Sequence, residues 1–82
     1  MDKLRIEKVK SIKERLDAIF DELSELQKAE QEDYNKMPKW QKDSDDGYEV
    51  YLNCDELDDA VYNVNTAIDI LKDINYYYEY GR

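Results

Sequence analysis

The feature that most constrains this chain is the spacing of its apolar residues, which alternates between three and four positions in two long segments. The first row consists of Val9, Ile12, Leu16, Ile19, Leu23 and Leu26. The second row consists of Val50, Cys54, Leu57, Val61, Val64, Ile68 and Leu71. Such a row lies on one face of an α-helix, but not on one face of a strand, whose side chains alternate in direction. The sequence therefore predicts an all-α protein built from two long amphipathic helices.

The first helix is expected over about residues 3–34, between a polar cap and the only proline of the chain. Asp2 precedes it, and an aspartate carboxylate at this position can accept a hydrogen bond from a free backbone N–H of the first turn. Pro38 disfavours the helical conformation for Met37, and Asn35 can end the helix in the left-handed conformation. The chain is therefore expected to leave its first helix before Pro38.

The expected loop covers about residues 35–44, and Met37 and Trp40 are its predicted anchors, folded back over the end of the hairpin. The second helix is predicted over about residues 45–79. Ser44 is its expected N-cap, and the two aspartates that follow lie in the first turn, where negative charge is favourable.

The start of the second helix has an alternative. Gly47 lowers the helix propensity of the earlier start by about 1 kcal/mol. Asn53, with Glu56 three residues later, forms a capping pair that could begin the helix there instead. The earlier start is preferred because Val50 and Cys54 are in phase with the apolar row that follows.

The two apolar rows also match each other when the chain folds back on itself. Partner numbers then add to 80, as for Leu16 with Val64 and Leu23 with Leu57, and residue 40 lies inside the loop. The expected architecture is a coiled-coil-like antiparallel two-helix hairpin, a single domain over residues 1–82. A lone hairpin buries one stripe per helix, which hardly offsets the entropy of ordering the chain. We therefore expect dimerisation into a four-helix bundle, or stabilisation by a partner.

Charge is distributed unevenly along the chain. It contains 21 acidic and 12 basic residues and has a net charge of -9. Residues 21–59 alone contain fourteen acidic and four basic residues, so the hairpin gathers a net charge of -10 in its loop half. Electrostatic repulsion argues against direct binding to nucleic acid or to an anionic membrane. The expected partner is a basic surface of another protein.

The acidic half also contains aromatic side chains, which commonly anchor protein interfaces. Acidic groups at helical spacing, with aromatic anchors, can imitate a nucleic-acid backbone toward a protein that binds one. The candidate partner-binding residues are Asp43, Asp45, Asp46, Glu49, Asp55, Glu56, Asp58, Asp59, Trp40, Tyr48 and Tyr51. Solubility, helix packing and loop closure are the alternative roles for these side chains. The tyrosine-rich segment 76–80 is open to the same two interpretations.

No enzyme activity is expected. The chain has no histidine, the commonest general base and transition-metal ligand. Cys54, the single cysteine, lies in the apolar row without a nearby cation, which predicts a buried, unreactive thiol. Residues 43–49 resemble part of a calcium loop, but their glycine is out of register and a helix N-terminus explains the same residues. Neither a metal nor a cofactor is predicted.

The expected location is the cytoplasm. No stretch is apolar enough to span a bilayer, and the first residues lack the apolar segment of a signal peptide. A lone cysteine suits a reducing compartment.

One short stretch carries a resemblance. The pattern N-x-[LM]-P-x-x-Q-x-x-S occurs here as Asn35, Met37, Pro38, Gln41 and Ser44, between two periodic helices. Over nearly the whole chain this layout resembles a group of small bacterial and phage helical-hairpin proteins without an established activity. In size, acidity and lack of catalytic groups the chain also resembles, in style, phage-encoded inhibitors of bacterial defence such as anti-CRISPR proteins.

The second likeness implies a stoichiometric inhibitor of a nucleic-acid-binding defence protein, which would act in the cytoplasm of the host cell. The alternative hypothesis is a structural coiled-coil assembly module without an inhibitory role. In that case the apolar seam would be the functional surface.

Overall fold

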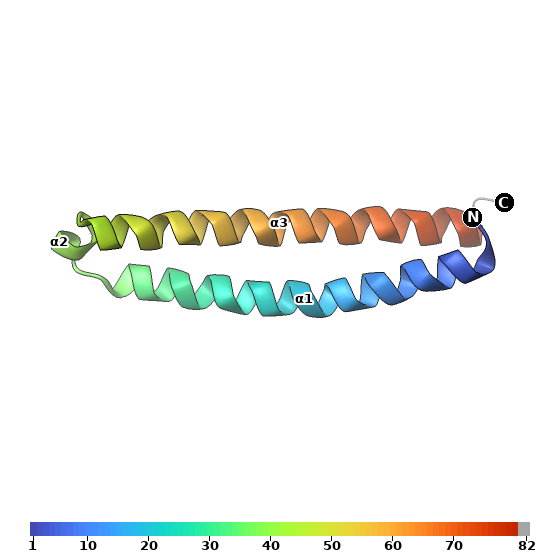
Figure 1. Ribbon diagram of the computed structural model, residues 1–82, viewed down its shortest axis with the longest axis horizontal. Helices are drawn as coiled ribbons and strands as arrows, with labels where there is room; N and C mark the ends of the chain where they lie inside the picture. The colour runs from blue at the N-terminus through green and yellow to red at the C-terminus, as the bar shows by residue number, and fades with distance from the viewer. Residues whose placement is uncertain (81–82) are drawn as a thin grey trace.

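The computed structural model describes the backbone of residues 1–80 and the side chains of residues 1–76. Two long helices, α1 (Lys3–Lys36) and α3 (Asp45–Tyr80), are joined through a single-turn helix, α2 (Lys39–Lys42). The long helices lie side by side and antiparallel, with α2 at one end and the N-terminus beside the end of α3 at the other (Figure 1). The Cα positions extend over 60 × 16 × 15 Å. The predicted antiparallel two-helix hairpin is confirmed.

The start of α1 is capped as predicted, whereas its end differs. The Asp2 carboxylate accepts a hydrogen bond of 2.8 Å from the backbone N–H of Arg5. The helix continues through Lys36, and no described non-glycine residue has a positive φ, so the expected left-handed cap at Asn35 is wrong. Met37 ends the helix in extended conformation, with φ -67° and ψ 137°, because a residue before proline avoids the helical region.

The start of α3 is the earlier of the two predicted starts. Ser44 Oγ accepts a hydrogen bond of 3.2 Å from the backbone N–H of Gly47, and the Ser44 carbonyl accepts one from Tyr48. The helix therefore begins at Asp45, and the alternative start at Asn53 is wrong. The expected loop contains α2, which forms one turn after the proline over Lys39–Lys42.

Gly47 is required by the close approach of α2 to α3. A Cβ at this buried position would lie 2.0 Å from the carbonyl oxygen of Gln41 and 2.7 Å from the Cα of Lys42. These are backbone atoms and cannot move aside like a flexible side chain. The cost of glycine in helix propensity is therefore offset by the tight turn that it permits.

Trp40 does not anchor the loop, and this prediction is wrong. Its side chain is 75% exposed on α2, while that of Met37 is half-buried. The end of the hairpin is closed by Tyr34, whose ring lies 5.9 Å from that of Tyr51 and 5.0 Å below the Lys42 ammonium. These aromatic and cation–π contacts join all three helices.

The face of α1 that packs on α3 agrees with the predicted row in part, since Val9, Leu16 and Leu23 of that row are half-buried. The buried and half-buried positions of α1 are Ile6, Val9, Lys13, Leu16, Asp17, Phe20, Leu23, Ser24, Gln27, Glu30, Gln31 and Tyr34. The expected seam residues Ile12, Ile19 and Leu26 are instead 37%, 43% and 55% exposed. Three adjacent rows of α1 contain apolar side chains, and a single neighbouring helix covers only two of them.

The seam of α3 contains the predicted residues, all of them buried or half-buried. The cross-helix pairing is nevertheless shifted at the loop end. Glu30 contacts Asn53 and Tyr34 contacts Tyr51, so partner numbers add to 83 and 85 rather than 80. The shift occurs together with two other differences from the prediction. The row of α1 that faces α3 is only partly the predicted one, and α1 continues to Lys36 rather than ending at about residue 34.

For the stability of Gly47→Ala, the close contact around Gly47 and helix propensity predict changes of opposite sign. Propensity alone predicts that Gly47→Ala stabilises the protein by about 1 kcal/mol. The clash with α2 predicts a loss of about 1–3 kcal/mol instead, because backbone must shift to admit the methyl group. Urea denaturation followed by circular dichroism measures the difference. Asn63→Ala, at an exposed position of α3, is the control and should be neutral or slightly stabilising; a stabilising Gly47→Ala would contradict the contact.

Candidate functional site

All eleven candidate partner-binding residues are exposed to solvent. They lie on α2, on the first half of α3 and on the short turn between these helices, at the end of the hairpin remote from both termini (Figure 1). The structure separates them into groups, because a continuous helix from Asp45 onward distributes its side chains around the axis.

The largest group lies on one face of α3. Tyr48, Tyr51, Asp55, Asp58 and Asp59 follow one another at helical spacings, which bring them to the same side. The rings of Tyr48 and Tyr51 are stacked, with centroids 6.4 Å apart and an interplanar angle of 17°. The two aromatic rings therefore lie toward the loop on this face, and the three carboxylates follow them along the helix.

Tyr62 continues the same face and was missed by the sequence prediction. Its side chain is 71% exposed, and it lies four residues after Asp58 and three after Asp59. The signal that could have found it is this spacing, since residues three and four apart are neighbours on a helix. The Tyr–Asp face is defined here as Tyr48, Tyr51, Asp55, Asp58, Asp59 and Tyr62.

The remaining candidates lie elsewhere. Asp45 and Asp46 occupy the first turn of α3, where the helix dipole stabilises negative charge. Asp43 ends α2 and Trp40 is exposed on it. The last two candidates are Glu49 and Glu56, which are seven residues apart and therefore lie on the same side of α3. This side of the helix is not the one that contains the Tyr–Asp face.

The acidic groups of the Tyr–Asp face contrast with those of the open half. There, Arg5 pairs with Asp2 at 3.8 Å and Lys13 pairs with Asp17 at 2.8 Å. Asp55, Asp58 and Asp59 are exposed in a region of net negative charge, so their mutual repulsion lowers stability. Tyr51 has a structural role in addition, through its contact with Tyr34.

Cys54 lies directly beneath this surface and is only 5% exposed, as predicted for a seam residue. Burial, followed by the nearby carboxylates of Glu30, Asp55 and Asp58, raises the pKa of the Cys54 thiol. Both causes disfavour the thiolate, which is the nucleophilic form. The thiol is therefore protonated and unreactive near neutral pH.

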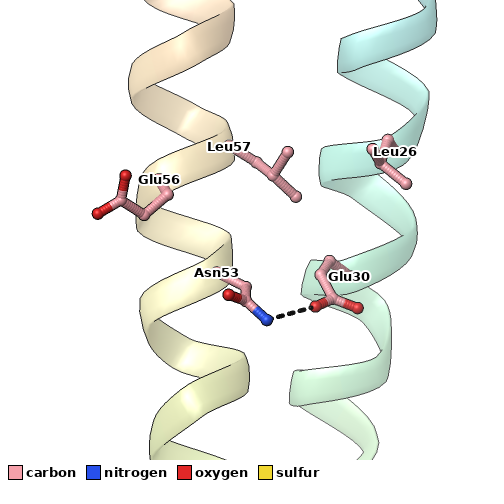
Figure 2. A pocket seen from close by; sticks show the side chains of 5 residues that line it. All are labelled: Leu26, Glu30, Asn53, Glu56 and Leu57. Carbon is pink, nitrogen blue, oxygen red and sulfur yellow. Dashed lines mark hydrogen bonds between the residues drawn. The ribbon is translucent and has the colours of Figure 1, made fainter.

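An open depression of about 370 Å³ lies between the two long helices near the loop end. Leu26 and Glu30 line it from α1, and Asn53, Glu56 and Leu57 line it from α3 (Figure 2). The amide of Asn53 donates a hydrogen bond of 3.4 Å to Glu30 Oε2. The leucines supply apolar walls, so this depression suits an apolar side chain better than a polar ligand.

Within residues 1–76, no group of three His, Cys, Asp or Glu side chains is arranged to hold a metal ion. Residues 45–49, which resembled part of a calcium loop, lie in the first turns of α3. No helix in the described part of the chain is long and apolar enough to cross a membrane. In the tyrosine-rich segment, Tyr76 is 58% exposed and the side chains of 77–80 lie outside the described residues.

Comparison with protein-family models, with curated proteins and with solved structures finds no match to this chain.

The environment of Cys54 predicts a pH dependence. The pKa of the Cys54 thiol is higher in the folded than in the unfolded chain, so the neutral thiol stabilises the folded state. This contribution is complete below the pKa of the unfolded chain and is lost as the pH rises through the pKa of the folded chain. We expect the free energy of unfolding to fall in this alkaline range more for the native chain than for Cys54→Ala. The measurement is urea denaturation of both chains across the range.

Alkylation by iodoacetamide provides an independent measurement for the same thiol. At about pH 8 the folded chain should react far more slowly than the chain in urea, since both burial and the raised pKa suppress the thiolate. Equal rates in the two conditions would show that Cys54 is accessible and contradict its placement.

Proposed function

We propose that this chain is an acidic protein–protein interaction module whose Tyr–Asp face binds a basic surface of another protein. The observation that carries the proposal is the exposure of large rings on either side of three clustered carboxylates: Tyr48 is 60%, Tyr51 45% and Tyr62 71% exposed. Clustered carboxylates lower the stability of an isolated chain. Tyrosine anchors surrounded by charge are, by contrast, well suited to an interface with a complementary surface.

The sharpest form of the proposal is a stoichiometric inhibitor of a nucleic-acid-binding protein, as in bacterial defence. Carboxylates on α3 would take the place of phosphates in a basic groove, and tyrosine rings would take the place of stacked bases. A preformed helix presents both groups without the ordering entropy that a flexible segment loses on binding. Trp40, exposed on the adjoining α2, is a further anchor at the edge of this surface.

A structural assembly module is the second candidate function. The observation that favours it is the exposure of Ile12, Ile19 and Leu26 along α1. In that case the apolar side of the hairpin, and not the acidic face, would be the functional surface. Substitutions on the Tyr–Asp face would impair the first function, and substitutions on the apolar side of α1 would impair the second.

Charge removal at the Tyr–Asp face tests the proposal. Asp55→Asn, Asp58→Asn and Asp59→Asn together change the net charge from -9 to -6 while preserving side-chain size. We expect binding of basic nucleic-acid-binding proteins from a bacterial lysate to weaken roughly tenfold or more, because complementary charge pairs are lost. The measurement is quantitative mass spectrometry of proteins retained on the immobilised chain and eluted with a short DNA duplex.

The matched control is Asp21→Asn, Glu25→Gln and Glu32→Gln, which makes the same charge change at exposed positions of α1. The control should retain the captured proteins at about 0.1 M salt and lose them at about 1 M, where the screening length falls from about 10 Å to about 3 Å. Equal retention by the two triple variants would show that net charge alone, and not the Tyr–Asp face, is recognised.

A further inference from the structure

An apolar flank remains uncovered along one side of the hairpin. Ile12, Ile19 and Leu26 form a row on α1 at intervals of seven residues and are 37%, 43% and 55% exposed. A second row on α3, at the same interval, consists of the half-buried Ala60, Ala67 and Ile74. We call these six residues the apolar flank.

The two rows lie on the same side of the molecule. Leu26 lines the depression between the helices together with Asn53, and Asn53 precedes Ala60 by seven residues and so belongs to the row of α3 (Figure 2). Two-stranded coiled coils contain two apolar rows per helix, whereas helices of a bundle contain a third. In both α1 and α3 the third row is apolar, and in both it faces this flank.

The charged border of the flank changes sign along the hairpin. Lys8, Arg15 and Glu22 are exposed, and each lies four residues before a member of the α1 row. The sign of the charge therefore changes between Arg15 and Glu22, and the same row continues toward the loop with Ala29 and Lys36. On α3, Glu56 adds a further carboxylate beside the depression.

We infer that a second copy of this chain covers the apolar flank, antiparallel to the first, with a two-fold axis near Ile19. This arrangement places Arg15 of each copy beside Glu22 of the other, whereas a parallel two-fold arrangement would place α1 against α3 of the other copy. Arg15 and Glu22 lie on either side of Ile19 and have opposite charges, so this pair is self-complementary under a two-fold rotation, which is the property of an isologous interface. Charge complementarity therefore identifies the occupant as this chain.

The dimensions of the flank agree with a stable dimer. The apolar rows themselves extend over about 21 Å of helix, but the side of the hairpin that contains them measures 60 Å by 15 Å between Cα positions. An antiparallel copy centred on Ile19 would cover most of this side, an area of about 900 Å², and a standard protein interface buries about 800 Å² per partner. In the antiparallel arrangement Ile12 of the second copy lies at the level of Leu26, where the apolar depression can receive it. The product is a four-helix bundle that covers the row left exposed by the hairpin.

The inference is independent of the proposed binding function. Tyr62 lies two residues after Ala60, which separates these side chains by about 200° around α3. The Tyr–Asp face therefore stays exposed in the dimer, and the antiparallel arrangement presents one such face near each end. Loss of dimerisation and loss of partner binding can be measured separately.

Two leucine substitutions test the surface. Leu26→Glu introduces a charge into the flank, and Leu52→Glu introduces the same charge on the outer side of α3, where Leu52 is 42% exposed. Sedimentation equilibrium at about 50 µM, well above a micromolar Kd, should show twice the mass of one chain for the native protein and for Leu52→Glu. Leu26→Glu should sediment as a single chain. A native protein that sediments as a single chain overturns the inference.

Cross-linking provides a second test of the dimer that does not depend on Leu26→Glu remaining folded. In a Cys54→Ala background, Ile19→Cys should form an intermolecular disulfide on mild oxidation, because the two-fold axis brings the two thiols together. Leu52→Cys in the same background should remain reduced. Equal cross-linking at the two positions would show random collision and contradict a two-fold axis near Ile19.

Charge substitutions test the orientation. Arg15→Gln removes an attraction in the antiparallel dimer and should weaken dimerisation severalfold. In a parallel two-fold dimer α1 would face α3 of the other copy, and Arg15 would have no Glu22 beside it. The substitution would then leave dimerisation unchanged, a result that overturns the antiparallel arrangement. Arg15→Glu should weaken dimerisation about tenfold, and adding Glu22→Arg to the same chain should restore it. Stronger dimerisation of Arg15→Gln would overturn the antiparallel arrangement.

Discussion

The interaction on which this structure depends is the packing of α1 on α3 along a seam two side chains wide. Each long helix has one long neighbour, so few side chains leave water completely. Among the described residues, the buried apolar side chains are Ile6, Cys54 and Ile68. Polar groups are tolerated at the margins of such a seam because solvent stays close; Lys13 keeps 24% of its side chain exposed and pairs with Asp17 at 2.8 Å. The narrow seam fixes the antiparallel course of the chain, and that course gathers the carboxylates at one end.

Features set by neighbours in the sequence could be predicted from it. The cap at Asp2, the cap at Ser44 and the extended backbone of Met37 each depend on contacts within four residues, so local rules were sufficient. Contacts between distant segments were different. Three rows of α1 are apolar, and periodicity alone does not say which two meet α3. The exposure of Trp40 and the need for glycine at Gly47 likewise depend on where α2 lies.

The candidate site was predictable in its chemistry and less so in its extent. Charge density predicted an exposed acidic surface, since carboxylates without partners remain in water. The bounds of α3 determine which of these carboxylates share a face. Because α3 is continuous from Asp45 to Tyr80, the face extends beyond the most acidic part of the chain. Tyr62 was missed because acidic residues become sparse after Asp59. A search by helical spacing, rather than by charge density, includes it.

A polar contact at the margin of the seam is consistent with the observed register. The hydrogen bond between Asn53 and Glu30 exists in the observed pairing, whereas partner numbers that add to 80 would place Asn53 opposite Gln27. Asn75 Oδ1 is buried without a hydrogen-bond partner among the described residues, and an unsatisfied buried group costs about 1–3 kcal/mol. The apolar rows of α1 are similar, so the choice of the row that faces α3 depends on small differences in packing and in polar contacts. The same selection leaves Ile12, Ile19 and Leu26 outward, so a second copy can bury apolar surface that the hairpin alone cannot.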